Sequence, residues 1–289
     1  MEENMAMGWL PDFPDFRDFG AGHEKIAPLL EKTGVADPEK ATLPDSKDLR
    51  AWCSPIENQN PLGSCTAHAG AGLFEYFEQR AFGKHIDASR LFLYKATRDL
   101  LGKKGDTGAY LRTTMAAMAL FGIPPEKYWP YVPAKYDVEP SGFLYAFAHN
   151  YRSLVYYSLD PPGTPPAVLL NRIKANLAAG LPGMFGFTVY SSISQAGATG
   201  MIPYPAAGEG MLGGHAVVAV GYDDAVKISN ANPGGTETTG ALLIRNSWGE
   251  GWGEKGYGWL PYDYVLKGLA IDWWSLIKAE WVDTGKFGL

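Results

Sequence analysis

The sequence predicts an α+β protein with two unlike lobes, because helical patterns come first and strand patterns follow. In residues 65–82, small and apolar side chains recur at helical spacing before Gly83. After residue 180, short apolar segments alternate with glycine-rich turns, as in an antiparallel sheet. The 289 residues, 46% of them hydrophobic, are enough for two lobes around one cleft.

Two more helices and a crossover complete the expected helical part. Residues 111–121 form a second helix that ends before a glycine and a proline pair. Residues 166–179 form a third, with Pro166 near its start and Gly180 at its end. Residues 125–165 are rich in proline and tyrosine, and we expect them to cross between the lobes.

The expected strands lie in the second half of the chain. Residues 223–240 include consecutive Pro233, Gly234 and Gly235, so we expect a long polar hairpin loop there. The strand segments bounded by such turns are 184–189, 216–222, 241–246 and 256–260.

Residues 1–42 differ in composition from the rest and are predicted to form an arm. They hold nine acidic and four basic residues, a net charge of −5 out of −6 for the whole chain. Phe13, Phe16 and Phe19 recur every third residue, which places them on one side of a polyproline II segment. We expect a strap docked over the cleft in cis; a flexible acidic tail is the alternative.

Composition argues against several classes of protein. There is no basic stripe of the kind that nucleic-acid binding needs, and no apolar run of the roughly 18 residues that a membrane helix needs. The chain has two cysteines, Cys53 and Cys65, and its first residues lack the pattern of a secretory signal. We therefore expect two free thiols and a cytoplasmic location.

Cys65 is the candidate nucleophile. It begins the predicted helix directly after Gly63 and Ser64, and the positive end of a helix dipole favours a thiolate. A buried structural cysteine is the alternative interpretation.

His215 is the candidate general base. It follows a double glycine and precedes a strand, so a substrate backbone can approach it closely. His68 is the rival, since it lies three residues after Cys65 on the same helix, but we expect it to turn into the protein.

Two amides supply the remaining roles. Asn246 is expected to accept a hydrogen bond from the imidazole, with Trp248 and Trp252 shielding that bond from water. Gln59, six residues before Cys65, is expected to donate to an oxyanion. For Asn246, Trp248 and Trp252, the alternative interpretation is a turn asparagine beside two tryptophans of the core. Jointly the residues form a cysteine, histidine and asparagine constellation for acyl transfer.

These motifs resemble the papain-like cysteine peptidases, in their prokaryotic and viral branch. The similarity covers about residues 43–289. It rests on the spacing from Gln59 to Cys65, on Gly214-His215-Ala216-Val217 before Val220-Gly221-Tyr222, on Asn246-Ser247-Trp248-Gly249-Glu250-Gly251-Trp252-Gly253, and on Gly105-Asp106-Thr107-Gly108-Ala109-Tyr110 as a glycine loop.

The resemblance implies a papain-like two-lobe fold with the active-site cleft between the lobes. The helical lobe would span about 55–150, and an antiparallel, barrel-like β-rich lobe about 151–289. Tyr110, Leu111 and Ala216 would line an apolar substrate pocket. All substrate-binding residues that the resemblance implies are Gly63, Ser64, Gly108, Ala109, Tyr110, Leu111, Gly214, Ala216 and Trp248.

The chain departs from the family pattern at a pair of cysteines. Leu62 and Asp106 stand where the family often has two cysteines joined in a disulfide. The two loops that such a disulfide holds together would lack it here.

The function implied is hydrolysis of peptide bonds in peptide or protein substrates through a thioester, by an endopeptidase without metal or cofactor. An exopeptidase, a deconjugating enzyme or a peptide ligase would use the same site. An inactive peptide-binding scaffold is a further alternative, which Cys65→Ala would distinguish from the enzymes.

Overall fold

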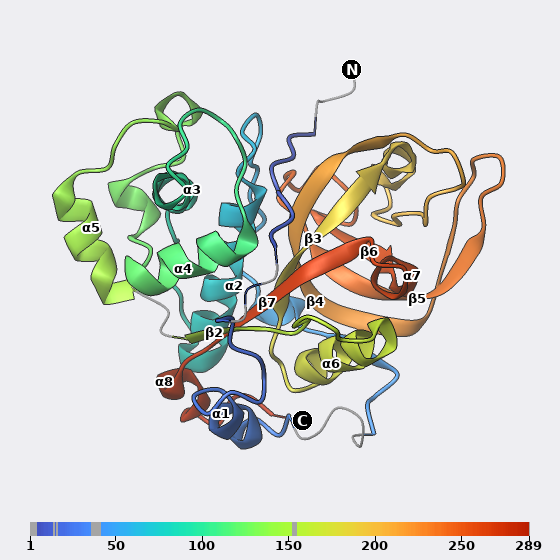
Figure 1. Ribbon diagram of the computed structural model, residues 1–289, viewed down its shortest axis with the longest axis horizontal. Coiled ribbons are helices and arrows are strands. Elements are labelled where there is room, and N and C mark those ends of the chain that lie inside the picture. The colour runs from blue at the N-terminus through green and yellow to red at the C-terminus, as the bar shows by residue number, and fades with distance from the viewer. Residues whose placement is uncertain (1–4, 14, 16, 36–41, 152–154, 289) are drawn as a thin grey trace.

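A helical lobe and a β-rich lobe lie side by side in the structure, a computed structural model (Figure 1). The α+β fold with two unlike lobes is therefore confirmed. The residues that the structure describes are 5–13, 15, 17–35, 42–151 and 155–288.

The central element of the helical lobe is α2, Cys65–Phe82, as predicted. Its small residues let other helices approach closely: a Cβ atom on Gly70 would lie 3.0 Å from the sulfur of Met118 in α4, Leu111–Leu120. The helix ends at Gly83, whose φ of 70° is readily adopted by glycine. Cys65 is thereby fixed at the N-terminus of a long, buried helix.

A helix that the sequence analysis did not predict, α3, packs against both α2 and α4. It spans Arg90–Leu100, and the Ser89 side chain caps it by accepting from the backbone N–H of Phe92. Its basic residues are buried by pairing with carboxylates, as for Arg98 with Asp137 at 2.7 Å. Charged side chains in buried positions masked the apolar periodicity. The lobe also contains α5, Gly142–Ala148, within the expected crossover.

The β-rich lobe is built on one antiparallel sheet, and the described strands form an open path rather than a closed barrel. The order along the path is β2-β7-β3-β4-β5-β6, and β1 pairs with β4. The strands are β1 (Ser46–Asp48), β2 (Val155–Ser158), β3 (Gly183–Tyr190), β4 (Met211–Ser229), β5 (Glu237–Arg245), β6 (Tyr257–Pro261) and β7 (Ala270–Ile277).

The expected polar loop at 223–240 is mostly strand. β4 continues to Ser229 and β5 begins at Glu237, with register shifts between Asp223 and Lys227 that accommodate the polar residues. Exposed strand positions carry polar side chains without losing the ladder, which is why polarity alone gave the wrong prediction.

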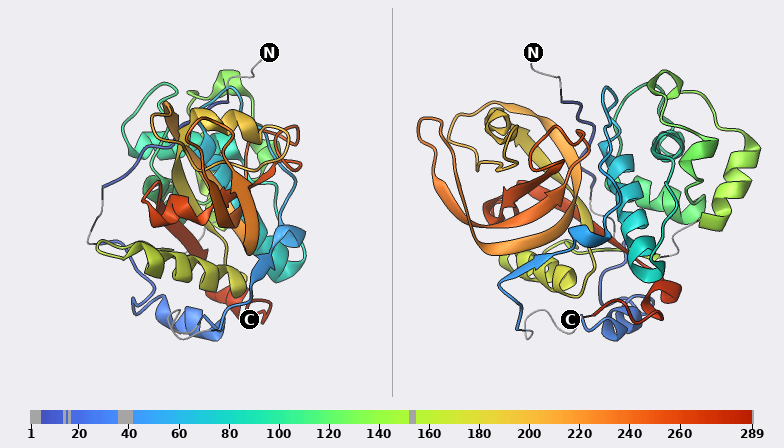
Figure 2. Two further views of the ribbon diagram at one scale, coloured as in Figure 1. Left: turned by 90° about the vertical axis from the view of Figure 1, so that its right-hand side faces the viewer. Right: turned by 180° about the vertical axis from the view of Figure 1, so that it is seen from behind.

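Four further helices complete the described part of the chain. They are α1 (Ala27–Lys32), α6 (Pro166–Ala178), α7 (Tyr262–Leu266) and α8 (Ala279–Val282). After β7 the chain returns to the helical lobe, where Trp281 of α8 stacks on Phe77 of α2 with ring centroids 5.0 Å apart. Figure 2 shows α1 and α8 together at the end of the molecule where the C-terminus lies.

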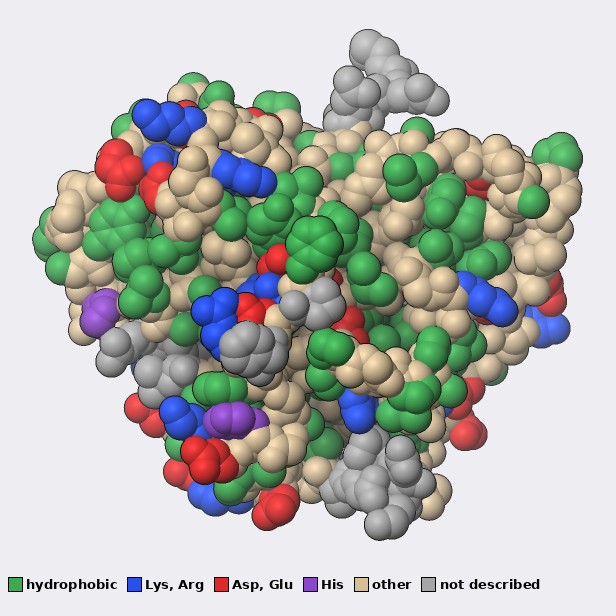
Figure 3. Space-filling model, viewed as in Figure 1, with side chains coloured by type: hydrophobic (Ala, Val, Ile, Leu, Met, Phe, Trp, Pro, Cys, Tyr) green, Lys and Arg blue, Asp and Glu red, His purple; other side chains and the backbone are tan. Residues whose placement is uncertain are grey.

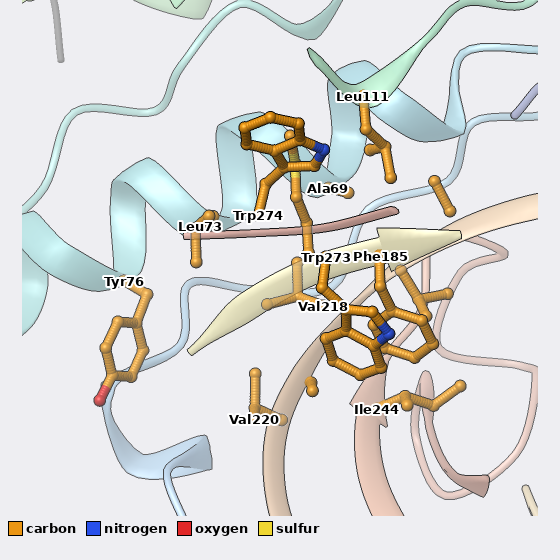
Figure 4. Packing of buried hydrophobic residues seen from close by; sticks show 14 of the residues in the cluster. Ala69, Leu73, Tyr76, Leu111, Phe185, Val218, Val220, Ile244, Trp273 and Trp274 are labelled. Atoms are coloured by element: carbon orange, nitrogen blue, oxygen red, sulfur yellow. The ribbon is translucent and has the colours of Figure 1, made fainter. Parts of the chain in front are cut away.

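One hydrophobic core joins the lobes. Ala69 and Leu73 of α2 and Val218 of β4 belong to it, together with Phe185 and Trp273, whose rings stack 3.9 Å apart (Figure 4). Because β4 packs directly on α2, the beginning of that helix is held against the strand that carries His215. None of the described helices is both long and apolar enough to cross a membrane.

Candidate active site

Cys65 is the first residue of α2 and its side chain is buried. The backbone N–H of Ala216, the residue after His215, faces the thiol, and so does the backbone N–H of Gly8 from the arm. The structure therefore places the sulfur beside the strand segment that carries the imidazole.

His215 is held from two sides in β4. Its Nε2 lies 2.7 Å from Oδ1 of Asn246, and the Trp248 ring stacks on the imidazole at 4.3 Å. Trp252 packs edge-on against Trp248, so both tryptophans screen the hydrogen bond as expected. Among the described residues, Nδ1 of His215 has no hydrogen-bond partner. The Nε2 contact with an amide oxygen makes Nε2 the protonated nitrogen and leaves Nδ1 as the basic one.

Burial keeps the thiol and the imidazole uncharged in this state. It raises the pKa of Cys65 to about 11, an effect that the N–H groups of Ala216 and Gly8 only partly offset. Burial also lowers the pKa of His215 to about 4, against the opposing hydrogen bond to Asn246. Desolvation by the surrounding residues therefore opposes the thiolate that the helix N-terminus favours.

Gln59 is locked to the turn that follows Asn246. Its Oε1 accepts from the hydroxyl of Ser247 at 2.6 Å, and its backbone N–H donates to the Ser247 carbonyl at 2.8 Å. The side-chain Nε2 donates to the carbonyls of Leu62 and Ala6, each at 3.0 Å. Trp248 Nε1 also donates to Ala6, at 3.1 Å, so two donors of the site hold a peptide carbonyl of the arm.

The arm runs between the lobes at residues 6–10 and bonds to both of them (Figure 1). On the helical side, Ala109 donates to Gly8 at 2.8 Å and accepts from Leu10 at 3.0 Å. On the β side, the N–H of Trp9 donates to Gly214 at 3.2 Å. In Figure 3, apolar side chains fill much of the boundary between the lobes on the face shown.

The arm backbone fits only because glycines meet there. A Cβ on Gly8 would lie 1.8 Å from the carbonyl oxygen of Gly63. A Cβ on Gly108, whose φ is 69°, would lie 2.2 Å from the carbonyl oxygen of Gly8. These contacts bring Gly63 and Gly108, both expected at the substrate site, against the arm.

The arm residues that fill the cleft are not the phenylalanines that the spacing indicated. Phe13 is 87% exposed, Phe19 stacks on His23, and Phe16 lies outside the described residues. Ala6, Gly8 and Trp9 make the contacts instead; no signal in the spacing of the aromatic residues distinguished them.

The other expected substrate residues lie at different depths. Ser64 precedes α2, and its hydroxyl bonds to Tyr131 at 2.8 Å. Tyr110 is half-buried at the start of α4, whereas Leu111 and Ala216 are fully buried.

A carboxylate links the two loops that lack the family's disulfide. Asp106 accepts from the backbone N–H of Gly63 at 3.0 Å and also from the hydroxyl of Tyr94. Tyr94 in turn accepts from the N–H of Gly108 at 3.1 Å. Hydrogen bonds thus hold the nucleophile loop to the glycine loop.

His68, the rival base, points away from this arrangement. Its Nδ1 lies 3.1 Å from the carbonyl oxygen of Ser64, and its ring packs edge-on against Tyr131. Burial lowers the pKa of His68 to about 3. In the described part of the chain, no group of three or more histidine, cysteine or acidic side chains could hold a metal ion.

A recess beside the cleft holds the Trp9 side chain, and its floor is Asp272. Trp9 Nε1 donates to Oδ2 of Asp272 at 3.0 Å, and Trp9 is 5% exposed. Sequence reasoning missed Asp272 and expected an apolar pocket at Tyr110, Leu111 and Ala216. Docking of the arm was expected, but neither β7 nor the contact of Trp9 with Asp272 could be foreseen from local patterns.

Comparisons with known proteins agree with this geometry. A model of the papain family cysteine proteases matches residues 43–267. An uncharacterized peptidase C1-like protein of Acanthamoeba polyphaga mimivirus is 34% identical over 76% of this chain and 68% of its own length.

Solved structures give the same result. Xylellain, a cysteine protease from Xylella fastidiosa, is 31% identical with a TM-score of 0.74, covering 95% of this chain and 97% of that one. Digestive procathepsin L 3 of Tenebrio molitor, at 19% identity, shares the fold with a TM-score of 0.63 over 94% of this chain and 84% of its own. The viral and bacterial relatives fit the branch that the motifs indicated. The chain therefore belongs to the papain family of cysteine proteases.

Proposed function

We propose that this chain is a cysteine endopeptidase in which Cys65 is the nucleophile and His215 the general base and acid. Nδ1 of His215 takes the thiol proton as the sulfur attacks a peptide carbonyl, and then gives it to the departing amine. Water hydrolyses the thioester and returns the thiol. Asn246 keeps the proton on Nε2 and the ring in place.

The observation that carries this proposal is the 2.7 Å contact between His215 Nε2 and Asn246 Oδ1 beside a buried cysteine. It fixes the tautomer that leaves Nδ1 basic. The position of Cys65 beside the N–H of Ala216 supports the same assignment, because residue 216 is adjacent to the imidazole in β4.

Gln59 Nε2 is proposed to hold the oxyanion together with the backbone N–H of Cys65. The first N–H groups of a helix lack intrahelical partners, so the latter is available as a donor. The bond from Gln59 Nε2 to Ala6 supports this role, since a peptide carbonyl already occupies that donor. Loss of one such donor typically slows turnover by about 10²–10³-fold.

The path of the arm favours an endopeptidase over an exopeptidase. The chain passes Gln59 at Ala6, continues past Gly214 at Trp9, and then runs on to α1. A polypeptide thus crosses the site with residues on both sides of it, whereas an exopeptidase needs one end of the cleft closed.

The arm is proposed to keep the enzyme latent in cis. It occupies the donors of the site at Ala6 and buries the thiol under Gly8. Displacing it would rehydrate Cys65 and let the thiolate and imidazolium pair form. We also infer a reducing, cytoplasmic location, which the free thiols of Cys53 and Cys65 support.

A thiol-directed epoxide tests the proposal on a Gly8→Val variant, in which docking of the arm is disfavoured. We expect one adduct, on Cys65, and internal cleavage of peptides blocked at both ends. Cys65→Ala should reduce cleavage by roughly 10³-fold or more, and the matched variant Cys53→Ala should not. An adduct on Cys53 alone, or full activity in Cys65→Ala, would contradict it.

A further inference from the structure

A small polar cavity lies beside Asn246, between α2 and β4. Its volume is about 10 Å³, which is close to the space that one water molecule needs. Its lining includes His68 of α2, Arg90 of α3, Ala216 of β4 and Asn246 itself. The cavity therefore joins the residue that holds the candidate base to a part of the helical lobe that plays no direct role in the site.

Three buried nitrogen atoms of this lining have no hydrogen-bond partner among the described residues. They are Nε2 of His68, Nε of Arg90 and Nδ2 of Asn246. His68 is 6% exposed, and Arg90 and Asn246 are each 4% exposed. Glu75, in the same lining, is satisfied, since it accepts from the backbone N–H of Ala88 at 2.8 Å. Buried polar atoms are rarely left without a partner, so the three nitrogens indicate an occupant of the cavity.

The three nitrogens offer the pattern of donors and acceptor that one water molecule satisfies. Nδ1 of His68 lies 3.1 Å from the carbonyl oxygen of Ser64, so it carries the ring proton and Nε2 is an acceptor. Burial lowers the pKa of His68 to about 3, which keeps the ring neutral. Nδ2 of Asn246 donates, and so does Nε of Arg90, whose terminal nitrogens are paired with acidic side chains. A water can accept from both donors and donate to His68.

Such a contact would fix the orientation of the Asn246 amide. Oδ1 of Asn246 lies 2.7 Å from Nε2 of His215 and accepts from the backbone N–H of Ser247 at 2.8 Å. With the amide turned end for end, Nδ2 would face His215, and the imidazole proton would have to move to Nδ1. Nδ1 could then not take the proton of Cys65. An acceptor for Nδ2 in its present position therefore supports the reactive tautomer.

We propose that one buried water joins Nδ2 of Asn246 to Nε2 of His68, which makes His68 a positioning residue for the amide that orients His215. His68 acts through Asn246 rather than on the reacting atoms. Its effect on turnover rests on the proposed peptidase function, whereas the water and the tautomers of the two imidazoles can be measured without any turnover.

The first test is nuclear magnetic resonance of the full chain with isotope-labelled histidine, which reports the tautomer of each ring. We expect the Nδ1–H form for His68 and the Nε2–H form for His215. In His68→Phe, which has no acceptor, the Nε2 proton of His215 should exchange with solvent roughly 5-fold faster, the effect of losing one hydrogen bond. His149→Phe, the same change at an exposed position, is the control.

His68→Gln separates the acceptor from a merely structural role. Its side-chain oxygen can replace Nε2 at the cavity, and both variants lose the bond to Ser64, so we expect His68→Gln to restore the exchange rate of the parent. An Nε2–H tautomer for His68 in the parent, or equal exchange rates in His68→Phe and His68→Gln, would overturn the proposal. A crystal structure without an ordered water at Nδ2 of Asn246 would overturn it too.

The second test measures kcat and KM on a fluorogenic peptide, with the arm displaced by Gly8→Val. Adding His68→Phe should lower kcat by roughly 5-fold and leave KM unchanged, and His68→Gln should restore kcat. Equal kcat in the two variants would overturn the positioning role. The expected tautomers and exchange rates, together with no cleavage by the Gly8→Val chain, would leave the contact between His68 and Asn246 standing and reject the peptidase function.

Discussion

Gln59 Nε2 donates a hydrogen bond to the carbonyl oxygen of Ala6 at 3.0 Å. The side chain expected to hold an oxyanion thus holds a peptide group of the chain itself. Trp248 donates to the same oxygen, and Gly8 follows against the thiol of Cys65. The arm is therefore not a loose tail, and the tests below separate its effect from that of the reacting groups.

Gly8→Val should activate the full-length protein. The Cβ would lie 1.8 Å from the carbonyl of Gly63, which is backbone and cannot move aside easily. Overpacking of about 1–3 kcal/mol corresponds to roughly a 5- to 150-fold shift toward the undocked arm. Initial rates on a fluorogenic peptide measure this. Gly22→Val, where a Cβ meets nothing within 4 Å, is the control, and equal rates in the two variants would contradict latency.

Arg112→Gln should loosen the arm without touching the reacting groups. Arg112 binds Asp12 and Asp18 of the arm, and both pairs are only partly exposed. We expect a several-fold higher initial rate, and a weaker response of the rate to added salt than in the unmodified chain. The rate is measured between low and high ionic strength. A lower rate in Arg112→Gln would show instead that the ion pairs of Arg112 with the arm support the active form.

Asn246→Ala should lower kcat/KM once the arm is displaced, because Nε2 of His215 loses the acceptor at 2.7 Å. We expect a loss on the order of 10- to 100-fold, the size found for partners that orient a metal-ligating imidazole. Asn150→Ala, on the exposed end of the helical lobe, is the control. Equal kcat/KM in Asn246→Ala and the parent would remove Asn246 from the site.

Local sequence signals were enough for α2 and for the identity of the grouped residues. A glycine that stops the helix and small residues along it placed Cys65 at its N-terminus, where the structure has it. The Asn246 turn carried glycines and tryptophans at fixed spacing, and the structure brings His215 to that asparagine. The helix and the turn depend on neighbouring residues, whereas the contact between His215 and Asn246 joins positions 31 residues apart and followed from the family resemblance.

Features that depend on distant partners could not be predicted in this way. α3 is buried through ion pairs such as Arg98 with Asp137, which lie far apart in the sequence. Asp272 matters because β7 pairs with β3 and because Trp9, 263 residues away, donates to it. No local pattern contains either contact.

The pH dependence of Cys65 alkylation tests the central claim most directly, namely that the arm suppresses the reactive thiol beside His215. Alkylation rates are measured by mass spectrometry of the Cys65 peptide in the intact chain and in Gly8→Val. We predict that Cys65 of the intact chain reacts only as pH approaches its pKa of about 11, and that Gly8→Val reacts at neutral pH and below. Identical profiles for the two proteins would contradict the account.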